Sequence, residues 1–392
     1  MKKIGYFLFN ESLDSGLIKS QVIDFLKNIN NDYEIYLINF VPFYKALDIY
    51  KVKKMNKQLS EYNVKILFLP ITIPSRLFVF KRWFKFFSYI YTPFLLILCY
   101  FFKFNILHCR SYFSTSIGVN CKKIIPELKI IFDTRSLFIE ENVSAGNIPY
   151  KDKSYYKWKQ EEKRLLVESD KVIAINESFK KYYTKYIPRR KLKIIPILVD
   201  EEVVFFDEEK RKKLRDKFNI KNKTVISYVG SFYGWNDPEL YADYFKKLSK
   251  VIETPFFLII TRDKKEIKKS LKKRGVESQN YYITSCKHKR IRDFLSAADY
   301  GIIVMNENLD SNTRLGVKFI EYLATGLTVV TNSNVGAAKN FILNNKCGII
   351  LEKEDELKEI NKIKRSKVLK KYKDNFSKNI ILRKYERVYK NV

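Results

Sequence analysis

The chain alternates short apolar runs with longer amphipathic stretches, and this rhythm limits its possible folds more than any other feature. Apolar runs of roughly four to eight residues predict buried strands. Helical patterns such as residues 18–28 separate most of the runs, which implies parallel pairing through right-handed crossovers. The first set of expected strands comprises residues 4–9, 33–40, 64–69, 106–109, 130–133 and 171–175. We therefore predict an α/β protein.

The same rhythm restarts after residues 194–206. The second set of strands comprises residues 224–229, 256–261, 281–284, 300–304 and 328–331, with 348–351 as an edge strand. We interpret the charged stretch 207–217 as the first helix of a second domain, and helical spacing over 376–388 predicts a terminal helix. A chain of 392 residues exceeds one ordinary core. We place the domain boundary near residue 205.

Cysteine and histidine usage narrows the chemistry. The five cysteines are scattered and odd in number, which fits a reducing cytosol better than a disulfide framework or a zinc site. The apolar run 4–9 is too short for the core of a signal peptide. With only His108 and His288 there is no histidine cluster, and there is no Asp-x-Asp pair. We therefore expect a cytoplasmic protein that uses no metal.

The formal net charge of +32 has three interpretations: nucleic-acid binding, attraction to anionic lipid, or a lysine-rich composition without a special role. No zinc finger, RNA-recognition signature or basic-zipper heptad accompanies the charge, so we expect no nucleic-acid partner. A field of this sign attracts phosphates and anionic membrane surfaces.

Residues 77–104 form an aromatic and aliphatic segment. Four basic residues interrupt it: Lys81, Arg82, Lys85 and Lys103. Its longest uncharged run, 86–102, falls short of the about 20 residues that a spanning helix needs. A spanning helix, a core helix and a helix that touches a bilayer surface all stay open. Cations beside Trp83 favour the last, and with it a peripheral position at an anionic membrane surface.

Polar residues follow the strands of the first half, where ligands of parallel sheets bind. The loop 10–16, which includes Ser15 and Gly16, leads into a helix whose N-terminus can hold an anion, although an ordinary turn explains it equally well. Arg110 follows one strand, and Asp133 and Arg135 follow the next. Either arginine can pair with Asp133, or the two can bind a phosphate or a charged sugar.

In the second half, Gly230 and Ser231 follow the strand 224–229, where a glycine lets backbone approach a phosphate. Residues 315–326 predict a helix that Gly326 ends. Lys318 and Glu321 share one face near its start. A glutamate there can accept hydrogen bonds from both hydroxyls of a ribose, while Lys318 and the helix N-terminus face a diphosphate. An exposed surface ion pair is the alternative.

The string Lys-x-x-Glu-Tyr-Leu-Ala-x-Gly at 318–326, preceded by Phe-Leu-Ser-Ala-Ala-Asp at 294–299, resembles the C-terminal domain of family-4-type bacterial glycosyltransferases. The order and spacing of further segments extend the resemblance: residues 169–175 with Ser178, 195–200, 228–232 and 334–337. It implies the GT-B fold, in which two Rossmann-like doubly wound domains face a central cleft and a C-terminal helix crosses back to the first domain. The acceptor domain would comprise 1–205 with 376–392, and the nucleotide-sugar domain 206–375.

The chain departs from the family pattern at several positions. Thr313 stands where the family has the first glutamate of its Glu-x-x-x-x-x-x-x-Glu motif. Ser231 and Asp237 occupy the places of an arginine and a lysine, so Arg262, Arg314 and Lys318 are the expected replacements. Asp133 aligns with a family histidine near the transferred sugar. These departures leave the donor sugar and the details of catalysis open.

The resemblance implies transfer of a sugar from a nucleoside diphosphate sugar to a lipid-linked surface glycan, such as capsule or O-antigen, at the inner face of the cell membrane. It also implies retention of anomeric configuration. We expect no cofactor and no metal. The catalytic candidates are Arg110, Asp133 and Arg135, the donor-binding candidates are Gly230, Ser231, Arg262, Arg314, Lys318 and Glu321, and Ser15 and Gly16 form the acceptor or sugar loop. Two alternatives are a sugar-nucleotide epimerase of the same fold and a non-catalytic, membrane-associated scaffold of glycan assembly.

Overall fold

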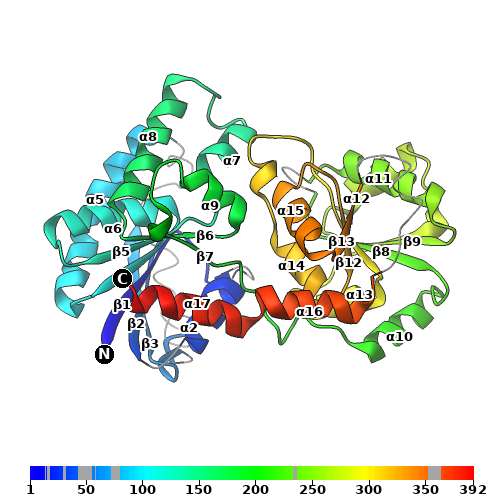
Figure 1. The fold of residues 1–392 in the computed structure, drawn as a ribbon, viewed down its shortest axis with the longest axis horizontal. Coiled ribbons are helices and arrows are strands. Elements are labelled where there is room, and N and C mark those ends of the chain that lie inside the picture. Colours follow the sequence, from blue (N-terminus) through cyan, green and yellow to red (C-terminus); the bar gives the residue numbers. More distant parts are fainter. Residues whose placement is uncertain are drawn as a thin grey trace. The chain divides into compact units, whose positions relative to one another are not determined.

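The structure, a computed structural model, describes residues 1–13, 15, 18–29, 32–42, 55–57, 59–71, 80–232, 236–351 and 363–392. These residues form two compact α/β units (Figure 1). Unit 1 comprises residues 1–198 and 381–392, and unit 2 comprises residues 199–380. The sequence had suggested boundaries near 205 and 376.

Unit 1 is built on a parallel seven-stranded sheet of order β3-β2-β1-β4-β5-β6-β7. Its strands are β1 Lys2–Phe9, β2 Tyr33–Pro42, β3 Val64–Ile71, β4 Ile106–Arg110, β5 Lys129–Asp133, β6 Lys171–Ala174 and β7 Leu192–Ile194. The six expected strands are confirmed. The sequence did not indicate β7, because Leu-Lys-Ile is too short to show a period.

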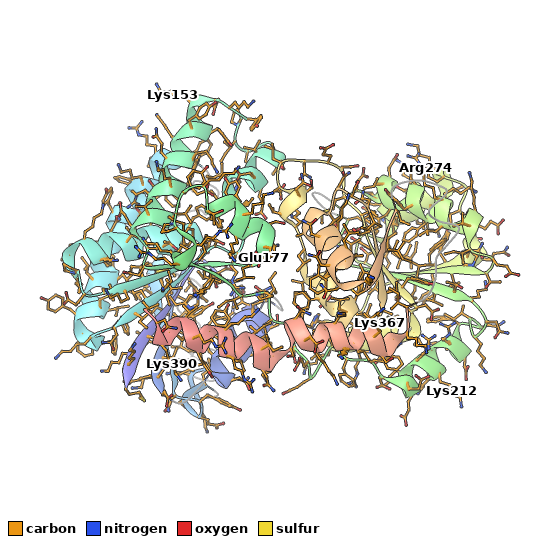
Figure 2. The ribbon with its side chains drawn as sticks, in the orientation of Figure 1. Lys153, Glu177, Lys212, Arg274, Lys367 and Lys390 are labelled. Atoms are coloured by element: carbon orange, nitrogen blue, oxygen red, sulfur yellow. The ribbon has the colours of Figure 1, made fainter. Side chains whose placement is uncertain are left out.

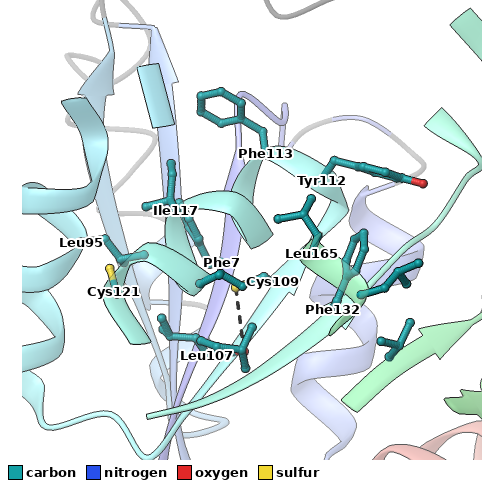
Figure 3. Packing of buried hydrophobic residues seen from close by; sticks show 14 of the residues in the cluster. Phe7, Leu95, Leu107, Cys109, Tyr112, Phe113, Ile117, Cys121, Phe132 and Leu165 are labelled. Atoms are coloured by element: carbon teal, nitrogen blue, oxygen red, sulfur yellow. Dashed lines mark hydrogen bonds between the residues drawn. The ribbon is translucent and has the colours of Figure 1, made fainter. Parts of the chain in front are cut away.

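Helices cover both faces of this sheet. They are the π-helix η1 Lys19–Ile23, α2 Asp24–Asn28, α5 Lys81–Phe102, α6 Ser111–Ile124, α7 Phe138–Ser144, α8 Lys153–Glu168, α9 Glu177–Tyr183, the short 3₁₀ turn η3 Arg189–Lys191 and α17 Lys378–Lys390. Successive strand residues point to opposite faces. Phe7 and Leu107 therefore pack with α5, α6 and α8, whereas Tyr6 and Ile106 pack with α2 and α17. Figure 3 shows the first of these cores around Phe7, Leu107 and Cys109.

Unit 2 is built on a parallel six-stranded sheet of order β10-β9-β8-β11-β12-β13. Its strands are β8 Thr224–Val229, β9 Pro255–Ile260, β10 Tyr281–Thr284, β11 Tyr300–Ile303, β12 Thr328–Thr331 and β13 Gly348–Ile350. All six were expected, with β13 at the edge. The expected helix at 207–217 is α10 Glu208–Lys217. In this sheet β8 is the switch point of the strand order, as β1 is in unit 1, and ligands bind beyond such strands.

The remaining helices of unit 2 connect these strands. They are α11 Pro238–Val251, α12 Lys264–Lys273, α13 Ile291–Ala297, α14 Val317–Ala324, α15 Gly336–Asn345 and α16 Arg365–Phe376, with the 3₁₀ turns η4 Ser278–Asn280, η5 His288–Arg290 and η6 Ser311–Thr313. Many lysines of unit 2 are exposed, among them Lys212 of α10 and Lys367 of α16 (Figure 2). The basic charge is therefore largely a property of the surface.

The expected terminal helix is α17, and its last three turns belong to the core of unit 1. Ile381, Leu382, Tyr385, Val388 and Tyr389 are all buried there. Two of these side chains, Tyr385 and Tyr389, also reach polar groups at the ends of β4 and β5. The helix is thus part of the fold of unit 1.

Candidate functional site

The start of α14 and the end of β8 meet in unit 2. Gly230 follows β8 with a φ of +137°, and Gly316 precedes α14 with a φ of +76°. The Lys318 ammonium donates to the Tyr228 hydroxyl at 3.1 Å and to Asn236 Oδ1 at 3.2 Å. A Cβ atom on Gly230 would lie 2.6 Å from Lys318 Nζ. The ammonium therefore lies directly against the backbone at the strand end.

The surroundings of Lys318 shift the pKa of its ammonium group. Burial lowers the pKa of Lys318 to about 7, although the Glu321 carboxylate acts in the opposite direction. The ammonium also lies 4.5 Å above the centre of the Tyr228 ring. The pKa of Lys318 therefore lies near neutral pH, and an anionic ligand would favour the charged form.

Glu321 occupies the next turn of α14 and is buried. Its Oε1 atom lies 3.1 Å from His288 Nε2. This hydrogen bond raises the pKa of His288 above its ordinary value. The burial of Glu321 excludes the alternative of an exposed surface ion pair, because only 6% of its side chain is exposed.

Sequence reasoning missed His288 as a partner of this site. It used the residue only to exclude a metal cluster, because nothing local links η5 to α14. One signal was present: His288 follows β10, whose carboxyl end lies at the same edge of the parallel sheet as that of β8. Tyr228 and Asn236, the two partners of Lys318, were missed for the same reason.

The other donor candidates lie in different environments. Ser231 is exposed beside Gly230, and its carbonyl accepts a hydrogen bond from Tyr228. Arg262 is exposed just beyond β9, the neighbour of β8. Arg314 is mostly buried and forms an ion pair with Asp310. Of the predicted donor residues, Gly230, Ser231, Lys318 and Glu321 lie together, whereas Asp310 already compensates the charge of Arg314.

In unit 1, Asp133 is completely buried at the end of β5. Its Oδ2 atom lies 2.6 Å from Arg135 Nη2 and 3.2 Å from His108 Nε2. Burial would raise the pKa of Asp133, but Arg135 and His108 outweigh it and hold that pKa below its ordinary value. Of the two arginines, Arg135 is the one that pairs with Asp133. Asp133, Arg135 and His108 thus form a buried cluster that contains an ion pair.

Two tyrosines of α17 complete this cluster. Tyr389 places its hydroxyl 2.7 Å from His108 Nδ1, and Tyr385 accepts a hydrogen bond of 2.8 Å from Arg135. Both tyrosines are buried, so the cluster joins the sheet to the terminal helix. The catalytic roles of Asp133 and Arg135 stay predictions.

Arg110 is buried at the end of β4 and faces the loop after β1. It donates to Gln21 Oε1 at 2.8 Å and lies 4.0 Å from Glu11 Oε1. Burial raises the pKa of Glu11, and Arg110 opposes this effect. Ser15 accepts a hydrogen bond from the Ile18 backbone at the entry to the next helix. Gly16 lies outside the described residues. The structure thus brings Arg110 to the predicted acceptor loop.

Among the residues that the structure describes, no three of the types His, Cys, Asp and Glu group closely enough to hold a metal ion. Positive charge at the site of unit 2 comes from Lys318 and from the N-terminus of α14, where no side chain caps the helix.

Comparison with known proteins gives this geometry a family context. Residues 210–383, which include Gly230, Lys318 and Glu321, match the family described as glycosyl transferases group 1. Residues 210–383 therefore have the sequence of a glycosyltransferase domain. No curated protein sequence matches the chain.

Solved glycosyltransferase structures of the GT-B fold share their fold with this chain over its whole length. Anabaena HepE in complex with UDP is 12% identical, with complete coverage of both chains and a TM-score of 0.69. A glycosyltransferase from Rickettsia africae is 16% identical over 100% of this chain and 98% of its own, with a TM-score of 0.68. WaaB, a lipopolysaccharide outer core galactosyltransferase, is 11% identical over both full chains, with a TM-score of 0.66. At these identities, the likeness concerns the fold.

Proposed function

We propose that the glycosyltransferase moves a sugar from a nucleoside diphosphate sugar to a hydroxyl group of a lipid-linked surface glycan, with retention of configuration and without a metal. The observation that carries the proposal is the meeting of Gly230, Lys318 and Glu321 at the end of β8. HepE structures with UDP and with UDP-glucose support a donor of this class. WaaB supports an acceptor in a cell-surface glycan.

The donor half of the reaction follows from unit 2. The Glu321 carboxylate accepts hydrogen bonds from the ribose hydroxyls. His288 orients this carboxylate through its hydrogen bond to Oε1. The diphosphate lies between Gly230, Lys318 and the N-terminus of α14. The bond between sugar C1 and the phosphate oxygen breaks as C1 bonds to the acceptor oxygen, and the proton of the acceptor hydroxyl leaves with the diphosphate. Negative charge grows on the diphosphate as it departs. The Lys318 ammonium stabilises that charge, which lowers the barrier.

The acceptor half is assigned to unit 1. Arg110 and the loop residues 11–13 and 15 lie where the strand order reverses, at the carboxyl ends of β1 and β4. The Asp133–Arg135 pair lies at the end of the adjacent strand and holds its loop in place. We assign this edge to the acceptor glycan and place the enzyme at the cytoplasmic face of the cell membrane.

A transfer assay tests the proposal. The purified enzyme is given a panel of UDP-, GDP- and dTDP-sugars with a lipid-linked glycan acceptor, and products are separated by mass. Transfer from one donor class supports the proposal. Epimerised donor without transfer, or no turnover with any donor, would contradict it.

Donor binding gives a second test that does not need the acceptor. Glu321→Gln should weaken binding of UDP-glucose by roughly 10- to 100-fold, because charge-assisted hydrogen bonds to ribose are lost. Glu253→Gln is the matched control, since Glu253 is exposed in the same unit. Equal loss in both variants would show that Glu321 does not bind the donor.

A further inference from the structure

Helix α5 presents an apolar face that no described residue of unit 1 covers. Eight large side chains on this face are between 41% and 77% exposed: Trp83, Phe86, Tyr89, Ile90, Phe94, Ile97, Tyr100 and Phe101. They recur along the whole helix, which has 22 residues and a length of about 33 Å. A contiguous exposed apolar surface of this kind marks a site of interaction.

The opposite face of α5 is firmly part of the core. Phe84, Tyr91 and Leu95 are buried, and α5 packs chiefly against α6. Asn120 of α6 donates a hydrogen bond to the Thr92 hydroxyl at 3.2 Å. One side of α5 is thus packed against the core, and the other side is exposed.

This placement decides how α5 can meet a bilayer. Residues 82–102 are long and apolar enough to cross a membrane, with a mean hydropathy of 1.4, and α5 is the one such helix among the described residues. Crossing would require Phe84, Tyr91 and Leu95 to leave the core of unit 1. A helix with one face in a protein core and one apolar face outside lies along a membrane surface instead.

Cations border the same exposed face. Arg82 and Lys85 are exposed in its first turns, and Lys103 is exposed at its end. The Lys85 ammonium lies 6.0 Å from the centre of the Tyr89 ring. Tryptophan and tyrosine favour the headgroup level of a membrane, and lysine and arginine attract anionic headgroups. The side chain of Lys81, which the sequence had added to this set, lies outside the described residues.

We propose that the exposed face of α5 docks on an anionic lipid bilayer, with the helix axis parallel to the membrane and its aromatic rings among the upper acyl chains. The occupant is a lipid surface because the face combines aromatic rings with cations and contains no acidic residue. The proposal goes beyond sugar transfer, and it stands on the α5 face alone.

Vesicle co-sedimentation tests the docking. We expect the protein to bind vesicles of equal parts phosphatidylcholine and phosphatidylglycerol more tightly than vesicles of phosphatidylcholine alone. Raising the salt from about 0.1 M to about 1 M shortens the Debye length from about 10 Å to about 3 Å and should reduce binding. Arg82→Glu with Lys85→Glu should weaken binding at least tenfold, since each cation contributes about fivefold near such a surface.

The aromatic part of the face is tested separately. Ile97→Ser, Tyr100→Ser and Phe101→Ser together should also release the protein, whereas Tyr156→Ser with Lys163→Glu on α8 should not, because those exposed residues lie on another helix. Lipids brominated in the upper acyl chain should quench Trp83 fluorescence, and Trp83→Phe should abolish the quenched component. Circular dichroism and UDP-glucose binding monitor the fold of each variant, so a loss of docking is distinguished from a failed donor site.

Three outcomes would overturn the proposal. Binding that the α5 variants leave unchanged would place the contact elsewhere. Binding that resists high salt and alkaline wash would indicate a spanning helix. Failure to bind any vesicle, together with a dimer that the Ile97, Tyr100 and Phe101 variant dissociates, would assign the face to a second copy of this chain.

Discussion

At the scale of single residues, Lys318 combines two requirements of a diphosphate site. Its ammonium is held by Tyr228 and Asn236, so its position is set before a ligand arrives. Burial lowers its pKa to about 7, so part of its charge appears only when an anion binds. The sequence indicated this residue because Lys318 and Glu321 share one helix.

Donor binding should therefore depend on pH. Lys318 is charged below about pH 7 and becomes neutral above it. A bound diphosphate would raise the pKa of Lys318. Affinity for UDP-glucose should be constant below pH 7 and fall as the pH rises, by up to about tenfold per unit. Calorimetry across this range measures the effect. Lys318→Met should bind weakly with a flat profile above pH 7, and Lys250→Met, an exposed control, should retain the slope.

Gly230 should tolerate no side chain. Its φ of +137° strains any other residue, and a Cβ would lie 2.4 Å from Lys318 Cε. Gly230→Ala should lower the free energy of unfolding by roughly 1–3 kcal/mol and weaken donor binding. Gly146→Ala is the control, because Gly146 has a φ of +75° but open space around it. Normal donor binding by Gly230→Ala would show that the Lys318 position does not matter.

At the scale of elements, the strands were predictable and their polar connections were not. Runs such as Phe256–Ile260 are apolar throughout, which only a buried strand or helix explains. The contacts of Asp133 depend on residues far away in the chain, since His108 lies on another strand and Tyr385 on α17. No local sequence pattern indicates such partners. The sequence therefore predicted that Asp133 follows a strand but not that Asp133 is buried.

The link between α17 and the sheet should carry measurable stability. Tyr389→Phe removes the hydroxyl that pairs with His108 Nδ1 at 2.7 Å and leaves a buried polar atom without a partner. The free energy of unfolding of unit 1 should fall by about 1–3 kcal/mol, as measured by denaturant titration. Tyr156→Phe, at an exposed tyrosine of α8, should change it little. An unchanged free energy of unfolding in Tyr389→Phe would mean that the hydrogen bond between Tyr389 and His108 is not formed in solution.

At the scale of the whole molecule, the net charge of +32 lets side chains neutralise an anionic substrate. Lys318 and the N-terminus of α14 supply positive charge where the diphosphate is proposed to bind. Sugar transfer should therefore persist in EDTA at the rate seen with added Mg²⁺, as measured by product formation. Complete loss in EDTA that Mg²⁺ or Mn²⁺ restores would show that a cation accompanies the donor.

The participation of α17 in unit 1 has a consequence for synthesis on the ribosome. Residues 381–389 fill the core beside β1 and β4, yet they are translated after all of unit 2. At about 5–20 residues per second, the intervening segment takes roughly 10–40 s to make. Throughout that interval, the side of the nascent unit 1 sheet that packs against α17 is not yet covered by that helix. Unit 2 can complete its core first, and a chaperone that shields the open sheet would act during this delay.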